Sequence, residues 1–180
     1  MQIKLILATL FISLIIAALA IYTSFLPKLV PLEVNMQVNQ SPKNIKLYLN
    51  NVENWGQWIV GNVEDIDKMR YNGKSFGKGA VLKWWSEKLG DGALELIDVR
   101  DTCISYQMIS DNNLFRQKGR IYWGKDSLNN TLIWRDTLDI STNLVGRWTA
   151  GEKFSNSLHK ANVQILQVLV QKLSQMPNSN

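Results

Sequence analysis

The 180-residue sequence predicts an α+β protein: a curved antiparallel sheet of about six or seven strands wrapped on a long C-terminal helix, preceded by one transmembrane helix. Three observations predict this class. An uncharged apolar run lies near the start, short alternating segments with turn signals fill the middle, and a run with helical periodicity lies near the end. We therefore expect an N-terminal anchor and link (1–30), one folded domain (31–176) and a tail (177–180).

A membrane anchor is predicted because 22 of the first thirty residues are apolar. Residues 5–26 carry no charge, and as a helix they would span about 33 Å, enough for a bilayer core of about 30 Å. Ala18-Leu19-Ala20 leaves a cleaved signal peptide as the alternative. The amino-terminal amine and Lys4 favour a single-pass protein whose domain lies on the extracytoplasmic, periplasmic side. The anchor residues that we single out are Leu5, Leu10, Phe11, Ile15, Ile21, Tyr22 and Leu26.

The domain is expected to begin with a strand and a short helix. Residues 27–31 read as a link framed by two prolines, and Leu32–Val38 then alternates apolar and polar side chains, which is typical of a half-buried strand. Ser41 and Pro42 suit the N-cap and first residue of a helix. That helix is expected to break near Asn54.

The middle of the chain predicts an antiparallel meander. Asn72-Gly73 and Asp91-Gly92 are hairpin signals, since these pairs readily take positive φ. Between such turns the alternating segments predict strands over Ala80–Ser86, Ala93–Val99, Ile104–Ile109, Phe115–Trp123 and Thr131–Ile140.

A long helix is predicted from Gly146 to Ser174. Its polar residues Lys160, Gln164, Gln167, Gln171 and Ser174 recur at spacings of three and four, so they form one narrow stripe. Nearly all other positions are apolar, which predicts a wide buried arc. A helix held in a curved sheet often leaves a cavity between the two.

Four motifs follow one another along the domain. They are the strand Leu32–Val38 followed by Ser41-Pro42, the segment Leu49–Trp58, Gly77-Lys78-Gly79 before Trp84, and Leu132-Ile133-Trp134. In this order they resemble the SRPBCC superfamily, also called START-like or helix-grip, with its polyketide cyclase/dehydrase and lipid-transport group. The resemblance covers residues 32–173 and extends to membrane-anchored bacterial members. It implies a helix-grip fold with an apolar cavity.

The composition excludes several kinds of chemistry. One Cys and one His form neither an internal disulfide nor a Cys/His zinc site. The sequence holds no P-loop, dinucleotide-binding glycine motif, or metalloprotease or hydrolase nucleophile motif. Without Lys4 and Lys28 the net charge of +5 falls to +3 for residues 31–180, which is too small to indicate nucleic-acid binding. We expect no cofactor, no metal and no nucleic-acid partner, and the sequence leaves the oligomeric state unknown.

Asp136 is the main polar candidate because it falls in the inward apolar row of the last predicted strand. A carboxylate there costs several kcal/mol unless it is paired or protonated. It suits a ligand contact or a general acid/base, with Gln117 as a second polar group. The alternative is that Arg147 pairs with Asp136 near the strand end. The single histidine, His159, is expected at the surface beside the polar stripe.

Five of the seven tryptophans are expected at the wall or mouth of a helix-grip cavity, which would suit a flat or polyprenyl-like ligand, although they equally suit a filled core. They are Trp55, Trp58, Trp84, Trp134 and Trp148. The residues predicted to bind the ligand are Trp55, Trp58, Trp84, Tyr106, Gln117, Ile121, Trp134, Asp136, Trp148, Phe154 and Leu158.

The favoured function is a membrane-tethered binding or carrier module for a hydrophobic, lipid-like small molecule. One alternative is a non-enzymatic partner-docking or stress-response domain, which would use the terminal helix or the basic stripe Arg116, Lys118 and Arg120. The other is a polyketide-cyclase-like enzyme that uses Asp136. The single His and the single Cys favour binding over catalysis.

Overall fold

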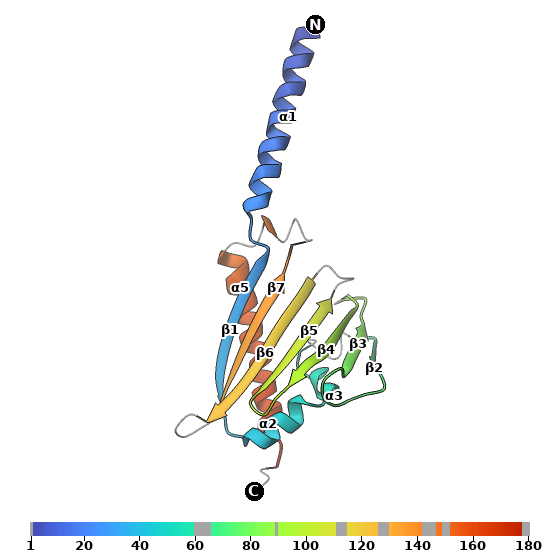
Figure 1. Cartoon of the computed structure of the whole chain (residues 1–180), viewed down its shortest axis with the longest axis vertical. Helices are drawn as coiled ribbons and strands as arrows, with labels where there is room; N and C mark the ends of the chain where they lie inside the picture. The colour runs from blue at the N-terminus through green and yellow to red at the C-terminus, as the bar shows by residue number, and fades with distance from the viewer. Residues whose placement is uncertain are drawn as a thin grey trace.

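The computed structural model describes residues 2–59, 66–88, 90–110, 115–125, 130–141, 147–148 and 152–177. It shows a seven-stranded antiparallel sheet with helix α5 behind it and helix α1 projecting from one end (Figure 1). The strand order is β1-β7-β6-β5-β4-β3-β2, a meander closed by the return of β1 beside β7. The strands are β1 (Leu29–Val38), β2 (Lys68–Tyr71), β3 (Val81–Trp85), β4 (Gly92–Val99), β5 (Cys103–Ser110), β6 (Phe115–Lys125) and β7 (Asn130–Asp139). The predicted α+β class and strand number are confirmed.

Helix α1 (Gln2–Phe25) extends from the sheet end at which β1 begins (Figure 1). Most of the predicted anchor side chains are exposed on it, among them Leu10, Phe11, Ile15, Ile21 and Tyr22. Leu26 is half-buried beyond its end, and the side chain of Leu5 lies outside the described residues. In the part of the chain that the structure describes, no helix has both the length and the apolar character of a membrane span.

Strand β1 begins three residues earlier than predicted. Leu29–Pro31, expected in the link, pairs with β7 in register with Thr137–Asp139. Proline lacks the N–H that a central strand must donate, and so it is restricted to sheet edges. Pro31 is compatible with β1 because β1 lies at the edge and pairs only with β7.

The two short helices start where the capping residues predict. Ser41 caps α2 (Pro42–Leu49) by accepting a hydrogen bond from the backbone N of Asn44, and Pro42 occupies the first turn. Asn51 caps α3 (Val52–Trp55) in the same way through Glu53 N. The break falls before Val52, slightly earlier than expected, and α3 delivers Trp55 into the core.

Helix α5 (Glu152–Ser174) is shorter and less buried than predicted. The proposed start at Gly146 lies outside the described residues. Leu166, Leu169 and Leu173 are fully buried, whereas Ala161 and Val168 are exposed. The wide buried arc was wrong, because α5 packs on one face of the sheet, chiefly along the edge strand β1, and its far side meets solvent.

The core consists of two apolar clusters along the sheet face that carries α5. The main cluster includes Val34, Leu49, Trp55, Trp58, Ile121, Trp134 and Leu166. The end cluster, nearer α1, comprises Val30, Leu32, Leu138 and Ile140, with partly buried Phe115, Phe154 and Leu158 packed against them. Strand β7 contributes to both clusters, and Asp136 lies on it between their members Trp134 and Leu138.

Candidate functional site

Asp136 is a buried carboxylate, 3% exposed, on the inner face of β7. Its Oδ2 accepts hydrogen bonds from the Tyr106 hydroxyl at 3.0 Å and from Gln117 Nε2. Its Oδ1 accepts the backbone N–H of Thr137 at 3.1 Å. A carboxylate has about four acceptor positions, so three donors leave Oδ1 able to accept one more.

Tyr106 reaches Asp136 by crossing Gly119, which lies between them on β6. A Cβ built on Gly119 would lie 2.4 Å from the Tyr106 ring, so any larger residue would displace the ring. The Tyr106 hydroxyl also accepts a hydrogen bond from Trp134 Nε1 at 2.8 Å. The glycine thus allows a connected path from Trp134 through Tyr106 to Asp136.

The pKa of Asp136 is raised from 3.8 to about 6, mainly because burial removes water from the charged form. The hydrogen bonds from Gln117, Tyr106 and Thr137 oppose this rise. Burial also raises the pKa of Tyr106 well above its ordinary value, and the neighbouring Asp136 charge adds to that rise. At neutral pH Asp136 is therefore mostly ionised, and Tyr106 is a neutral donor.

The predicted alternative partner of Asp136 was wrong. Arg147 is buried, and its Nη2 donates to the carbonyl of Thr23 and, at 3.3 Å, to that of Leu26. These carbonyls belong to the C-terminal end of α1, where helical backbone acceptors lack intrahelical donors. Arg147 therefore joins the β7–α5 connection to α1.

The structure brings together most of the predicted ligand-binding residues. Trp55 contacts both Trp58 and Tyr106, with ring centroids 4.9 and 5.0 Å apart, and Trp58 contacts Trp134 at 6.0 Å. All four side chains are at most 2% exposed, as is Ile121. They form an aromatic part of the main core cluster on the sheet face that carries α5.

Of the other predicted residues, Trp84 belongs to the same main cluster, whereas Phe154, Leu158 and Trp148 lie outside it. Trp84 is buried on β3, where its ring covers Gly92 of β4. Phe154 and Leu158 belong to the end cluster. Trp148 is 51% exposed and packs edge-on against Tyr22 of α1, with centroids 5.6 Å apart, so the structure places it at the α1 junction. His159 is exposed, as expected.

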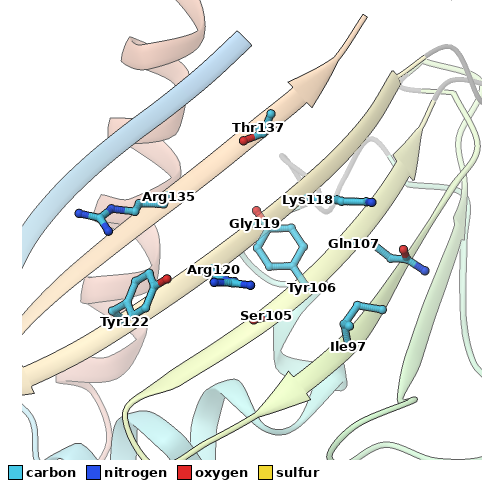
Figure 2. A pocket seen from close by; sticks show the side chains of 10 residues that line it. All are labelled: Ile97, Ser105, Tyr106, Gln107, Lys118, Gly119, Arg120, Tyr122, Arg135 and Thr137. Carbon is cyan, nitrogen blue, oxygen red and sulfur yellow. The ribbon is translucent and has the colours of Figure 1, made fainter. Parts of the chain in front are cut away.

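A hollow of about 450 Å³ lies on the opposite face of the sheet, away from α5 (Figure 2). Side chains of β4 to β7 surround it, and they alternate along each strand with the inward residues of the core. Tyr106 and Gly119 belong to the strands beneath it. The remaining lining residues are Ile97, Ser105, Gln107, Lys118, Arg120, Tyr122, Arg135 and Thr137.

Neither the known family models nor the curated proteins contain a match to this chain. Solved structures do share its fold. The di-domain ARO/CYC protein StfQ of the steffimycin biosynthetic pathway matches with a TM-score of 0.61 and 12% identity over 82% of this chain, which spans about half (52%) of StfQ. Ara h 8.0201 matches with a TM-score of 0.59 and 8% identity, over 82% of this chain and 99% of its own.

Truncated norcoclaurine synthase from Thalictrum flavum matches with a TM-score of 0.60 and 12% identity, over 83% of this chain and 96% of its own. This chain has the helix-grip fold. At these identities the likeness establishes the fold alone. It confirms the architecture that the sequence motifs implied, and the ligand has to be argued from the residues.

One buried polar residue on α5, Asn162, was not among the residues predicted from the sequence. Asn162 is 6% exposed on α5, four residues after Leu158 and four before Leu166. It therefore lies on the sheet-facing side, between the α5 members of the end cluster and the main cluster. Asp136 has the same position between the clusters on β7. The spacing of four residues from Leu158 and to Leu166 could have predicted this inward position.

Among the described residues no group of three or more His, Cys, Asp or Glu side chains is arranged to hold a metal ion. The chemistry available on the inner face is hydrogen bonding to a carboxylate, proton exchange with that carboxylate, and contact with aromatic and aliphatic walls.

Proposed function

We propose that the domain binds a hydrophobic small molecule between the sheet and α5, with its polar end at Asp136. The observation that supports this is a carboxylate with a remaining acceptor position, set between two apolar clusters. A ligand hydroxyl or amine would donate to Oδ1, and its apolar body would contact the end cluster. Carboxylic acids would be disfavoured at neutral pH, because two carboxylates in an apolar space repel each other.

The degree of burial supports entry of the ligand from the end of the domain nearer α1. Main-cluster residues such as Leu49, Trp55 and Ile121 are completely buried. In the end cluster Leu32 and Leu138 are 8% and 7% exposed, and Phe115, Phe154 and Leu158 are only partly buried. We infer that a ligand enters beside the end cluster, where these side chains reach solvent.

A photo-crosslinking experiment tests this binding. The full chain in phosphatidylcholine nanodiscs is incubated with a diazirine-bearing long-chain alcohol, irradiated, and mapped by peptide mass spectrometry. We expect labels on β1, β7 and α5 residues of the end cluster. Leu158→Trp fills the space and should abolish these labels, whereas Val168→Trp, on the exposed side of α5, should keep them. Labels confined to α1, or equal in both variants, would contradict the proposal.

We further propose that α1 attaches the domain to a membrane, with the domain on the extracytoplasmic side. The support is the uncharged stretch between Lys4 and Lys28 and the exposed apolar side chains along α1. The full chain should remain in the membrane fraction after carbonate washing. Replacing Leu14 and Ile15 together by Arg should release it, whereas Val168→Arg should not. Digestion of the domain by protease added outside spheroplasts tests the orientation.

A second candidate function is acid–base catalysis by Asp136. The observation that favours it is the pKa of about 6, which lets this buried carboxyl exchange protons near neutral pH. If the domain is a cyclase-type enzyme, Asp136→Asn should abolish turnover of a poly-β-ketone substrate while labelling by the diazirine alcohol persists. Unchanged turnover in that variant would exclude Asp136 as the acid or base.

A further inference from the structure

The hollow on the outer sheet face has an unusual arrangement of charge. Among the described residues, its lining includes three cations, Lys118, Arg120 and Arg135, and no Asp or Glu (Figure 2). Arg120 of β6 and Arg135 of β7 are direct cross-strand partners. Like charges placed directly opposite each other on neighbouring strands are destabilising. The register therefore concentrates positive charge at this point of the sheet.

The carboxylates near the rim of the hollow pair with side chains other than Lys118 and Arg120. Glu33 binds Arg135 at 2.7 Å, Asp98 binds Arg100 at 2.6 Å, and Glu95 Oε2 accepts a hydrogen bond from Gln107 at 2.9 Å. Within the described residues, no carboxylate lies within ion-pair distance of Lys118 or Arg120. Arg120 hydrogen-bonds the side chain of Tyr122 and is attracted by Asp98, and Lys118 is attracted by Asp139. Since neither cation is held in an ion pair among the described residues, both can contact an anion in the hollow.

Neutral donors and an aromatic wall complete the hollow. Ser105 is the cross-strand partner of Arg120 on β5, and Thr137 is the partner of Lys118 on β7, so each cation has a hydroxyl beside it. The guanidinium of Arg135 lies 5.6 Å from the Tyr122 ring centroid. A smaller hollow of about 190 Å³ shares Ser105, Arg120 and Tyr122 with the larger one, which places Arg120 at the junction of the two.

We propose that this outer hollow binds a small molecule carrying a phosphate group, with Arg120 and Lys118 as its cationic ligands and the hydroxyls of Ser105 and Thr137 as neutral donors. Arginine suits phosphate because its planar fork donates two parallel hydrogen bonds. The volume, about 450 Å³, exceeds that of phosphate itself and lies within the range of small-molecule sites. The organic part would contact Tyr122 and the exposed Ile97 of β4. This site is independent of the inner-face binding proposed above.

Isothermal titration calorimetry of the full chain in phosphatidylcholine nanodiscs tests the site. The probes are inorganic phosphate, pyrophosphate and adenosine 5′-monophosphate, titrated at constant ionic strength set with sodium chloride. We expect the nucleotide and pyrophosphate to bind, and Arg120→Gln or Lys118→Gln to weaken each by about tenfold or more. Arg116→Gln is the matched control, because Arg116 is exposed on the same face of β6 but lies outside the hollow, opposite Asp139. It should change affinity less than about twofold.

Several results would overturn the proposal. Equal weakening by Arg116→Gln would show that the probes respond to general surface charge. Absence of binding for all three probes would exclude a phosphate site at this place. Binding to phosphatidylglycerol vesicles that depends on Arg120, without binding of the soluble probes, would assign the surface to lipid headgroups instead. Retention of affinity in both Arg120→Gln and Lys118→Gln would place any bound phosphate elsewhere.

Discussion

Asp136 shows how one residue links the sheet to the chemistry of the site. Strand periodicity directs its side chain inward, and the strand register places Gly119 of β6 opposite it and Tyr106 of β5 beyond. Three hydrogen bonds keep the ionised form acceptable in a largely apolar environment, while desolvation still raises its pKa. The burial of this carboxylate therefore has a cost in stability, and Oδ1 keeps one acceptor position beyond the bond from Thr137.

Because burial raises the pKa of Asp136, the free energy of unfolding should depend on pH. The pKa of Asp136 is about 6 in the folded state and about 3.8 when unfolded, so between these values the folded state binds more protons. Stability should therefore fall as pH rises from about 4 to about 7, by up to about 3 kcal/mol from this group. Asp136→Asn should remove this component, measured as the pH dependence of the free energy of unfolding in urea, followed by tryptophan fluorescence in mild detergent.

Asp139→Asn is the matched control on the same strand. Hydrogen bonds from Ser141 lower the pKa of Asp139, so its contribution to stability is lost as pH falls, which is the opposite sign. A wild-type slope that persists in Asp136→Asn would show that Asp136 is not the titrating group.

A substitution at Gly119 gives a second prediction for a single residue. Gly119→Ala should destabilise the protein by about 1–3 kcal/mol, because the new Cβ would overlap the Tyr106 ring and break the hydrogen bond to Asp136. Gly124→Ala is the control on the same strand, since no atom lies within 4 Å of the Cβ that would be added there. Comparable unfolding midpoints in urea for the two variants would contradict the crossing of Tyr106 over Gly119.

At the scale of elements, a polar residue fixes the position of α5. The last carbonyls of a helix lack intrahelical donors. Gln40, which follows β1 and is 4% exposed, donates from Nε2 to the carbonyl of Leu173 at 3.0 Å and to that of Met176 at 3.2 Å. Its Oε1 accepts from Asn44 Nδ2 at 2.7 Å. Gln40 thus joins the C-terminal end of α5 to the start of α2.

Gln40→Ala should therefore destabilise the protein by about 1–3 kcal/mol, because it leaves buried donors and acceptors unpaired. The measurement is the unfolding midpoint in urea, together with hydrogen exchange at the last turn of α5, which should become faster. Gln37→Ala, at an exposed position of β1, should leave both unchanged. Equal effects of the two substitutions would exclude a capping role for Gln40.

For the whole molecule, the junction between α1 and the domain sets how α1 is oriented. Arg147 donates to the carbonyls of Thr23 and Leu26, Trp148 packs on Tyr22, and Ile140 N donates to the Lys28 carbonyl at 2.9 Å. These contacts connect the end of α1 to the sheet end where the end cluster lies. If α1 enters a membrane, as proposed above, the end cluster lies at the end of the domain nearer that membrane.

Arg147→Leu should loosen this junction. A cation at a helix C-terminus contributes up to about 1 kcal/mol, so amide exchange in the last turn of α1 should rise about two- to fivefold. The measurement is hydrogen exchange by mass spectrometry on the full chain. Arg135→Leu removes an arginine whose ion pair with Glu33 is exposed, and it should leave α1 unchanged. Unaltered exchange in Arg147→Leu would contradict the junction.

The sequence by itself determined the elements and the inward rows of this protein. Periodicity depends only on neighbouring residues, so Leu132, Trp134, Asp136 and Leu138 were correctly assigned to the buried face of β7, and Ser41 to a helix start. Strand β1 was extended through Pro31 only because an edge position tolerates proline, which depends on sheet order.

Tertiary structure decided which side chains meet. The partners of Asp136, the exposed side of α5, the union of Arg147 with α1 and the basic hollow on the outer face all arise from strand register and helix docking. Those depend on contacts between residues far apart in the chain, and a local pattern carries no information about them. For this reason the sequence correctly predicted that Asp136 faces inward, whereas its alternative partner, Arg147, was wrong.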